Sequence, residues 1–351
     1  MHIYLTGTAA SSVLALICSR VERKKNGAAY CFISALLSSF PLALIAAVRF
    51  NVGQDYPAYA HYFIQVRNGA GRDREPLFYL LNKAAALFSD DYVSIFVITS
   101  FLFVILVLLQ VFRDSPYPAL SVIMFVCAGY YFDFLNGTRQ MLGCAILICS
   151  LTFVCERKIL PFLLLVITAG LIHTTCFLFA PVWFFGHLGK RKNAVLIGTL
   201  AVFLMSDRIA AIVNTLIGET LYSMYIGSEF ETGKQGLVTL MINIVLFIFA
   251  YVFYDDSDKS YGIYFTLQAM TLCVSALTGK IVLINRLGWM FGMPAIILIP
   301  KALKNVRNRL LLSAGMVGIP FIYLVYLLYT VGVTNSNNVL PYMTVFSRIS
   351  G

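Results

Sequence analysis

Long apolar stretches recur from one end of the chain to the other, separated by polar connectors. A helix needs about 20 apolar residues to cross ~30 Å of hydrocarbon, and most of the stretches approach that length. Because backbone polar groups in hydrocarbon must be satisfied within the segment, each stretch is expected to be an α-helix. The pattern predicts an all-α, polytopic integral membrane protein with about 12 transmembrane helices. The predicted crossings are residues 3–19, 28–48, 92–112, 118–135, 140–155, 159–172, 174–187, 194–213, 236–254, 261–278, 287–300 and 310–330.

Two neighbouring stretches, 159–172 and 174–187, are shorter than the others. They fit either one long helix broken near Gly170–His173 or a re-entrant pair. The sequence alone leaves both arrangements open.

The positions of Lys and Arg predict the orientation of the chain. Short basic connectors of a multi-pass protein face the cytoplasm. The other connectors hold their basic residues singly, among Asp, Glu, Asn and Tyr, which places both termini and the loops near 49–91 and 207–235 outside. The spacing within 75–88 predicts an amphipathic helix on the outer membrane surface. The basic connectors are 20–25, 157–158, 190–192 and 301–309.

Composition supports this class. Of 351 residues, 60% are hydrophobic and only 12% are charged, about half the charged share of a soluble domain. The net charge of +10 does not indicate nucleic-acid binding, because the basic residues lie in connectors and form no basic arm. The eight Cys residues lack CxxC spacing and are expected to pack in helices. No acidic cluster has metal-ligand spacing, so no metal and no cofactor are expected. One integral domain over 1–351 is predicted.

Three arginines, Arg49, Arg139 and Arg286, stand at the outer ends of three separate predicted spans. A guanidinium at a membrane boundary is costly unless it meets an acid, a carbonyl or a phosphate. Its planar fork matches phosphate oxygens and its charge is permanent. The three positions therefore predict an outward-facing site for an anion such as a lipid-linked diphosphate, although any single one could instead extend to lipid headgroups.

Other polar residues gather at the same face. Asp55 and Glu75 are candidate general bases, and His173 is a candidate base or hydrogen-bond donor. Tyr59 offers a flat face and a hydroxyl of the kind that lines sugar clefts. Each has a structural alternative: Asp55 could pair with Arg49, and His173 could be a packed histidine. From these residues alone, an anionic-ligand site is predicted, but no reaction.

The order of these motifs resembles one known family. Residues 49–59, Arg-Phe-Asn-Val-Gly-Gln-Asp-Tyr-Pro-Ala-Tyr, resemble the R-x-x-V-G-x-D-Y-x-x-Y signature of the EpsG family of polysaccharide-assembly proteins. The resemblance continues in the same order over nearly the whole chain. Further matching elements are Glu75-Pro-Leu-Phe78, Asn136-Gly-Thr-Arg139-Gln140, His173-Thr-Thr175, Asn285-Arg286-Leu287 and Leu340-Pro341-Tyr342.

The resemblance implies a Wzy-type polymerase of O-antigen in lipopolysaccharide, of capsule or of exopolysaccharide, with a GT-C-like fold in the bacterial inner membrane. Such a glycosyltransferase would act at the periplasmic face, moving a glycan from undecaprenyl diphosphate onto an incoming lipid-linked repeat unit. Its expected partners are the lipid-linked oligosaccharide, membrane lipid, a chain-length regulator and a flippase.

The same resemblance implies roles for individual residues. Arg49, Arg139 and Arg286 would hold the diphosphate and stabilise charge on the leaving group. Asp55 is the first choice for activating the acceptor hydroxyl, with His173 and Glu75 behind it. Residues that would position the sugars are Gln140, Tyr59 and Asn285.

Other classes remain open. A flippase or transporter of lipid-linked oligosaccharide would need charges midway along several spans, whereas here nearly every charge lies at a span end. A membrane acyltransferase that modifies surface glycans would need its histidine near a cytoplasmic acyl donor, and His173 is predicted outside. An assembly subunit without catalytic activity is the remaining alternative.

Overall fold

The computed structural model describes residues 1–21, 27–71, 75–218, 236–281 and 284–348. Regular structure in these ranges is entirely helical, with isolated β-bridges joining Arg49 to Thr344 and Thr278 to Ile281. The all-α prediction is therefore confirmed. In chain order the helices are α1 His2–Ser19, α2 Gly27–Ala47, α3 Tyr56–Arg67, α4 Pro76–Phe88, α5 Val93–Asp114, α6 Pro118–Cys127, α7 Tyr130–Asn136, α8 Thr138–Cys155, α9 Ile159–Ile172, η1 Thr174–Phe179, α10 Val182–Phe185, η2 Gly186–Lys190, α11 Lys192–Leu204, α12 Ser206–Gly218, α13 Gly236–Val252, α14 Tyr261–Leu277, α15 Asn285–Gly292, α16 Ala295–Lys304, α17 Arg309–Leu327, η5 Leu328–Val333 and η6 Val345–Arg348.

The chain packs as two compact units. Unit 1 comprises Met1–Ser150, Leu160–Phe179 and Arg307–Gly351, and unit 2 comprises Leu151–Ile159 and Ala180–Val306. The prediction of one integral domain over 1–351 stays a prediction.

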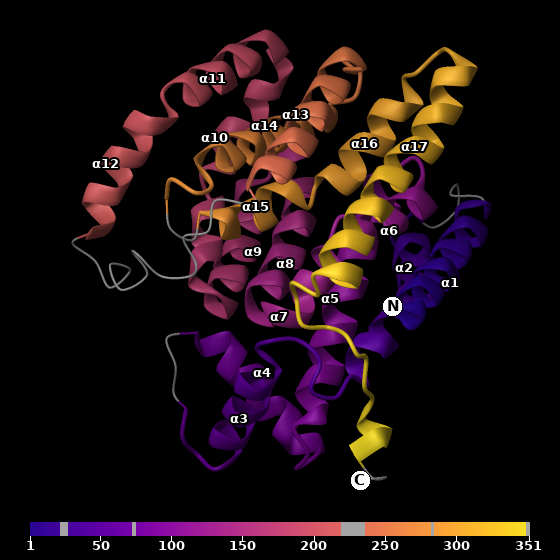
Figure 1. The fold of residues 1–351 in the computed structure, drawn as a ribbon, viewed down its shortest axis with the longest axis vertical. Coiled ribbons are helices and arrows are strands. Elements are labelled where there is room, and N and C mark those ends of the chain that lie inside the picture. Colours follow the sequence, from indigo (N-terminus) through magenta and orange to yellow (C-terminus); the bar gives the residue numbers. More distant parts are fainter. Residues whose placement is uncertain (22–26, 72–74, 219–235, 282–283, 349–351) are drawn as a thin grey trace. The chain divides into compact units, whose positions relative to one another are not determined.

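Helices α1, α2, α5 and α6 pack together in unit 1, with α1 and α2 side by side (Figure 1). The buried face of α2 consists mainly of small residues, whereas large side chains such as Phe32, Leu37 and Phe40 are exposed. Small residues let helix backbones approach closely, and lipid solvates the large side chains outside. This distribution, large apolar residues outside and small ones inside, is typical of a membrane bundle.

Unit 2 is built around α14, which contacts α11, α13, α15, α16 and η2. Almost every residue of α14 is buried, including the polar Gln268 and Ser275. Both polar side chains bond to Asn243 on α13, Gln268 at 3.1 Å and Ser275 at 2.9 Å. A helix that is buried on all sides belongs inside a bundle, and the bonds to Asn243 pair the amide nitrogen of Gln268 and the hydroxyl of Ser275.

Six helices among the described residues are long and apolar enough to cross a membrane, or up to eight if two bent pairs each form one span. The chain is therefore a multi-pass membrane protein, but about 12 crossings and a GT-C-like arrangement are not confirmed. The predicted span 118–135 bends by 49° between α6 and α7, and 194–213 bends by 68° between α11 and α12. Residues 174–187 form short 3₁₀ and α turns, and α9 has only 14 residues.

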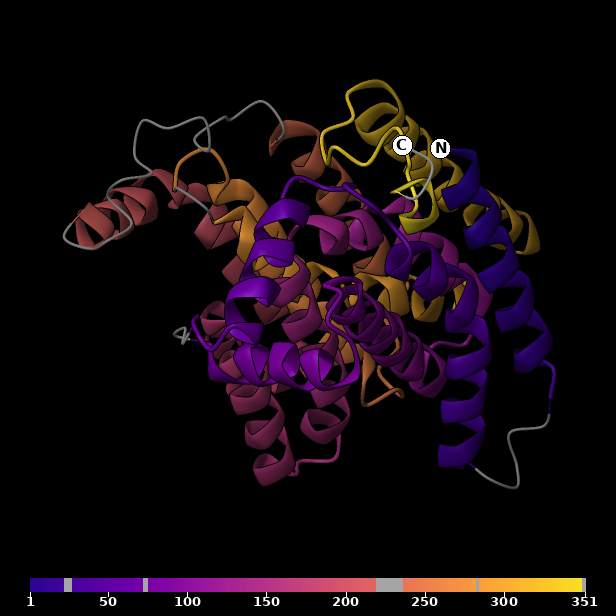
Figure 2. The same cartoon turned by 90° about the horizontal axis from the view of Figure 1, so that it is seen from below.

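The predicted loops contain helices. In the loop near 49–91, α4 occupies the predicted amphipathic segment, but α3 was not predicted. These two helices lie side by side at one end of unit 1 and are in front when the chain is viewed from that end (Figure 2). In the loop near 207–235, α12 extends to Gly218, and residues 219–235 lie outside the described residues.

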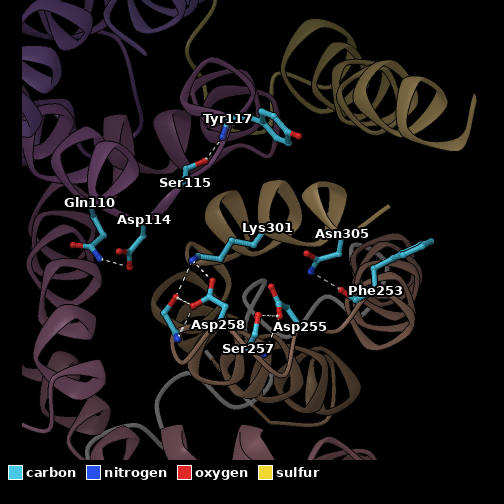
Figure 3. Close-up of polar contacts among 11 residues, drawn as sticks. Gln110, Asp114, Ser115, Tyr117, Phe253, Asp255, Ser257, Asp258, Lys301 and Asn305 are labelled. Carbon is cyan, nitrogen blue, oxygen red and sulfur yellow. Dashed lines mark hydrogen bonds and ion pairs between the residues drawn. The ribbon is translucent and has the colours of Figure 1, made fainter. Parts of the chain in front are cut away.

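Polar side chains are paired near the ends of helices in both units. In unit 1, Gln110 donates to Asp114 at 3.0 Å (Figure 3). In unit 2, Lys301 was predicted in a basic connector but lies within α16, buried, with Nζ 2.6 Å from Oδ2 of Asp258 (Figure 3). Burial raises the pKa of Asp258, yet hydrogen bonds from Lys301 and Ser260 outweigh it and leave the pKa lowered. The buried ammonium is thus paired, as its burial requires.

Candidate functional site

The segment after α2 turns sharply at Gly53, whose φ is +97°. A Cβ at this position would lie 2.5 Å from the carbonyl oxygen of Leu135, so only glycine fits. The next residue, Gln54, donates its backbone N–H to Oδ1 of Asn136 at 2.7 Å. Gly53 therefore allows the first family-like motif to pack against the start of the Asn136–Gln140 motif.

The C-terminal tail pairs with the same segment. Phe50 N–H donates to the Met343 carbonyl at 2.9 Å, and Val345 N–H donates to the Val48 carbonyl at 2.9 Å. Gly53 N–H donates to the Asn338 carbonyl at 2.9 Å. These bonds hold the tail against the motif from both sides of Arg49.

Arg49 lies inside this packing, with only 1% of its surface exposed. Its guanidinium carbon is 5.0 Å from the Phe96 ring centre and 5.6 Å from that of Phe134, and Nη2 donates to the Thr138 hydroxyl at 3.4 Å. Nε and Nη1 have no hydrogen-bond partner among the described residues. Burial lowers the pKa of Arg49, although nearby tyrosines favour its charge. This geometry gives Arg49 a packing role through cation–π contacts, and the predicted phosphate contact stays a prediction.

Glu75, Arg139 and His173 meet in unit 1. Glu75 stands at the N-cap of α4, Arg139 in the first turn of α8, and His173 directly after α9. Arg139 Nη1 lies 2.7 Å from Oε2 of Glu75, and His173 Nδ1 lies 2.5 Å from Oε1. We call these three residues the Glu75 cluster. One carboxylate thus links residues that are 64 and 98 positions away in the sequence.

Aromatic rings form one wall of the Glu75 cluster. The Arg139 guanidinium carbon lies 5.8 Å from the ring centres of both Tyr59 and Phe78. Tyr59 also accepts the backbone N–H of Arg139 at 3.4 Å. Tyr59 and Phe78 are buried, whereas the Arg139 side chain is 34% exposed. The rings fix the guanidinium while leaving it accessible from solution.

The groups around Glu75 favour the ionised form of its carboxyl. Burial raises the pKa of Glu75, but the hydrogen bond from His173 and the charge of Arg139 have the larger combined effect and leave it lowered. Burial also raises the pKa of Tyr59, which stays protonated. Glu75 is therefore a carboxylate that lies between the Arg139 guanidinium and the His173 ring.

The other predicted site residues are not members of the Glu75 cluster. Asp55 is exposed at the start of α3, and its charge acts on Tyr59. Gln140 is buried in α8. Arg286 is exposed in α15 of unit 2, which Asn285 begins, so their predicted place beside the Glu75 cluster stays a prediction. Among the described residues, no group of three or more His, Cys, Asp or Glu could hold a metal.

Sequence reasoning missed the supporting residues. Thr138, Phe96 and Phe134 surround Arg49, and Phe78 flanks Arg139. Thr138 and Phe78 lie within motifs already noted, one position before Arg139 and three after Glu75. The positions of Phe96 and Phe134 carry no comparable signal in the sequence.

The apolar helices and the paired charges at the ends of helices in unit 1 are those of a multi-pass membrane protein with a polar site in unit 1. The EpsG family matches residues 32–344, and the chain belongs to this family. Membership indicates a membrane protein of the polysaccharide-polymerase type, with a glycosyltransferase-like activity. No curated protein and no solved structure is detectably similar to the chain.

Proposed function

We propose that the chain is a Wzy-type glycosyltransferase that polymerises oligosaccharides linked to undecaprenyl diphosphate. Within an EpsG-family chain, the observation that carries this proposal is the Glu75 cluster, which joins a partly exposed guanidinium to an imidazole through one carboxylate. Glycosyl transfer from a lipid diphosphate needs a cation for the leaving group and an acceptor for the hydroxyl proton. The cluster contains both groups.

In the proposed reaction, Arg139 binds the diphosphate of the donor. A hydroxyl of the incoming repeat unit forms a bond to the anomeric carbon of the donor sugar. The bond from that carbon to the diphosphate oxygen breaks, and its electron pair stays on the diphosphate. A fixed guanidinium stabilises this developing charge without reorganisation in the transition state.

The remaining residues complete the proposed site. Tyr59 and Gln140 are proposed to orient sugar hydroxyls, and Asp55 to contact the acceptor. The sequence-based assignment of Arg286 and Asn285 to the donor stays a prediction, because these residues belong to unit 2. The basic connectors support an inner-membrane protein whose Glu75 cluster faces the periplasm. The proposed product is O-antigen of lipopolysaccharide, capsule or exopolysaccharide, and a flippase and a chain-length regulator are proposed partners.

Deletion of the gene in its host tests the proposal. We expect surface glycan on gels to fall from a ladder to a single repeat, and the wild-type gene to restore the ladder. The Arg139→Ala gene should not restore the ladder, because the leaving group loses its cation. A loss of this kind usually costs 10²–10³ in rate.

The matched control is Arg67→Ala, which removes an arginine of similar side-chain exposure, 38%, from α3. It should restore the ladder. Membrane levels of both variants are compared by immunoblot. If deletion removes the single repeat as well, an earlier step such as transport of the lipid-linked unit is indicated, and the polymerase proposal is wrong.

A further inference from the structure

We infer that His173 accepts the proton of the acceptor hydroxyl at its Nε2, and that Glu75 is the positioning residue that holds it ready. This inference rests on the proposed function and names the base of that reaction. It departs from the sequence-based first choice, Asp55.

The hydrogen bonds of Glu75 define which imidazole nitrogen can act. Oε1 lies 2.5 Å from His173 Nδ1 and also receives the backbone N–H of Thr174 at 3.4 Å. An ionised carboxylate only accepts hydrogen bonds, so Nδ1 carries the hydrogen. In the neutral imidazole the lone pair is then on Nε2, which is the arrangement of a general base.

The surroundings of Nε2 fit this role. The atom is buried and has no hydrogen-bond partner among the described residues. A buried polar atom without a partner is uncommon and is itself a reason to look for a ligand. A sugar hydroxyl that donates to Nε2 would satisfy it.

The two carboxylates of the region are less suited to the task. Both oxygens of Glu75 are engaged, Oε2 by Arg139 and Oε1 by His173. Asp55 is exposed at the start of α3. Imidazole is also the side chain whose ordinary titration range lies nearest neutral pH, where a general base is most effective.

The proposed step balances as follows. The acceptor oxygen bonds to the anomeric carbon while its proton moves to Nε2 of His173. The electron pair of the breaking bond stays on the diphosphate beside Arg139. The imidazolium is stabilised by Glu75 and later releases its proton to water. One carboxylate thereby positions both the base and the cation.

The test uses full-length protein in liposomes with a purified lipid-linked repeat unit, and measures kcat and KM for bond formation. His173→Asn retains a side-chain N–H that can donate to Glu75 but has no base. Its kcat should fall by about 10²–10⁴ with KM changed less than about threefold. His61→Asn, at an exposed histidine of α3, is the matched control and should keep the wild-type kcat.

Glu75→Gln tests the positioning role. Its amide can donate to Nδ1, which would place the hydrogen on Nε2 and block the base, so kcat should fall by about 10²-fold or more. In the His173→Asn background the same change should add less than about tenfold, because residues acting as a unit are not additive. If the role of Glu75 were purely structural, Glu75→Gln would lower kcat by the same factor in both backgrounds.

Three results separate the hypotheses. If wild-type protein forms no bond, the proposed function is wrong. If wild-type protein polymerises but His173→Asn keeps more than a third of kcat, the base assignment is overturned while the function stands. His173→Gln is measured in parallel, and the assignment is equally overturned if this second folded variant is active.

Discussion

Replacing Glu75 by Ala is expected to lower polymer formation at least a thousandfold. The change removes the acceptor 2.7 Å from Arg139 and the partner of His173 Nδ1 together, so cation and base both lose their position. Formation of polymer from lipid-linked repeats in isolated membranes measures the loss. Glu156→Ala removes an exposed carboxylate paired with Lys158 at 2.8 Å and should change the rate less than about twofold.

The pH dependence of stability gives a second measure of the same side chain. The folded pKa of Glu75 is below its ordinary value, so the carboxylate contributes stability that is full above about pH 5. That contribution is lost as pH falls through the folded pKa. The unfolding temperatures of wild type and Glu75→Ala in detergent should therefore differ at pH 7 and converge in acid. An equal difference at every pH would contradict the ionised pair.

Replacing Gly53 by Ala is expected to destabilise unit 1 by about 2–4 kcal/mol. The residue has a φ of +97°, and the added Cβ would meet the Leu135 carbonyl oxygen at 2.5 Å. Backbone atoms cannot yield as a flexible side chain can, so the end of α7 at Leu135 would have to move. Thermal unfolding and the yield of folded protein measure the effect.

Substitutions at two other glycines separate the effect of backbone strain from that of the steric clash. Gly69 has a φ of +83° but no atom within 4 Å of an added Cβ, so Gly69→Ala should show backbone strain without the clash. Gly318 lies in α17 with open space and an ordinary φ, so Gly318→Ala should be neutral or slightly stabilising. If all three variants unfold alike, the Gly53 contact is not what holds the motif.

Hydrophobic patterning predicts the long helices well. The stretches 28–48 and 92–112 correspond closely to α2 and α5, because long apolar runs have no alternative in hydrocarbon. It fails where a span bends. The 118–135 stretch is mostly apolar, but α6 ends at Cys127, and Gly129, with a φ of +96°, precedes α7. A single glycine is also tolerated within a helix, so Gly129 by itself does not predict the bend.

The Glu75 cluster could be predicted only in part. Glu75, Arg139 and His173 were each candidates because polar residues at span ends are unusual. Their mutual contacts could not be predicted, since they depend on how α4, α8 and α9 meet. The surroundings of Arg49 could not be predicted either. Its boundary position predicted a phosphate contact, which stays a prediction, and the Phe96 and Phe134 rings that pack against it are distant in the sequence.

The most direct measurement is bond formation by the purified protein alone, reconstituted in liposomes with an undecaprenyl-diphosphate-linked repeat unit. We expect a ladder of glycans and one equivalent of undecaprenyl diphosphate for each bond formed, with no ladder from Arg139→Ala. Movement of the intact lipid-linked unit across the bilayer, without a new glycosidic bond, would contradict the account and indicate a transporter.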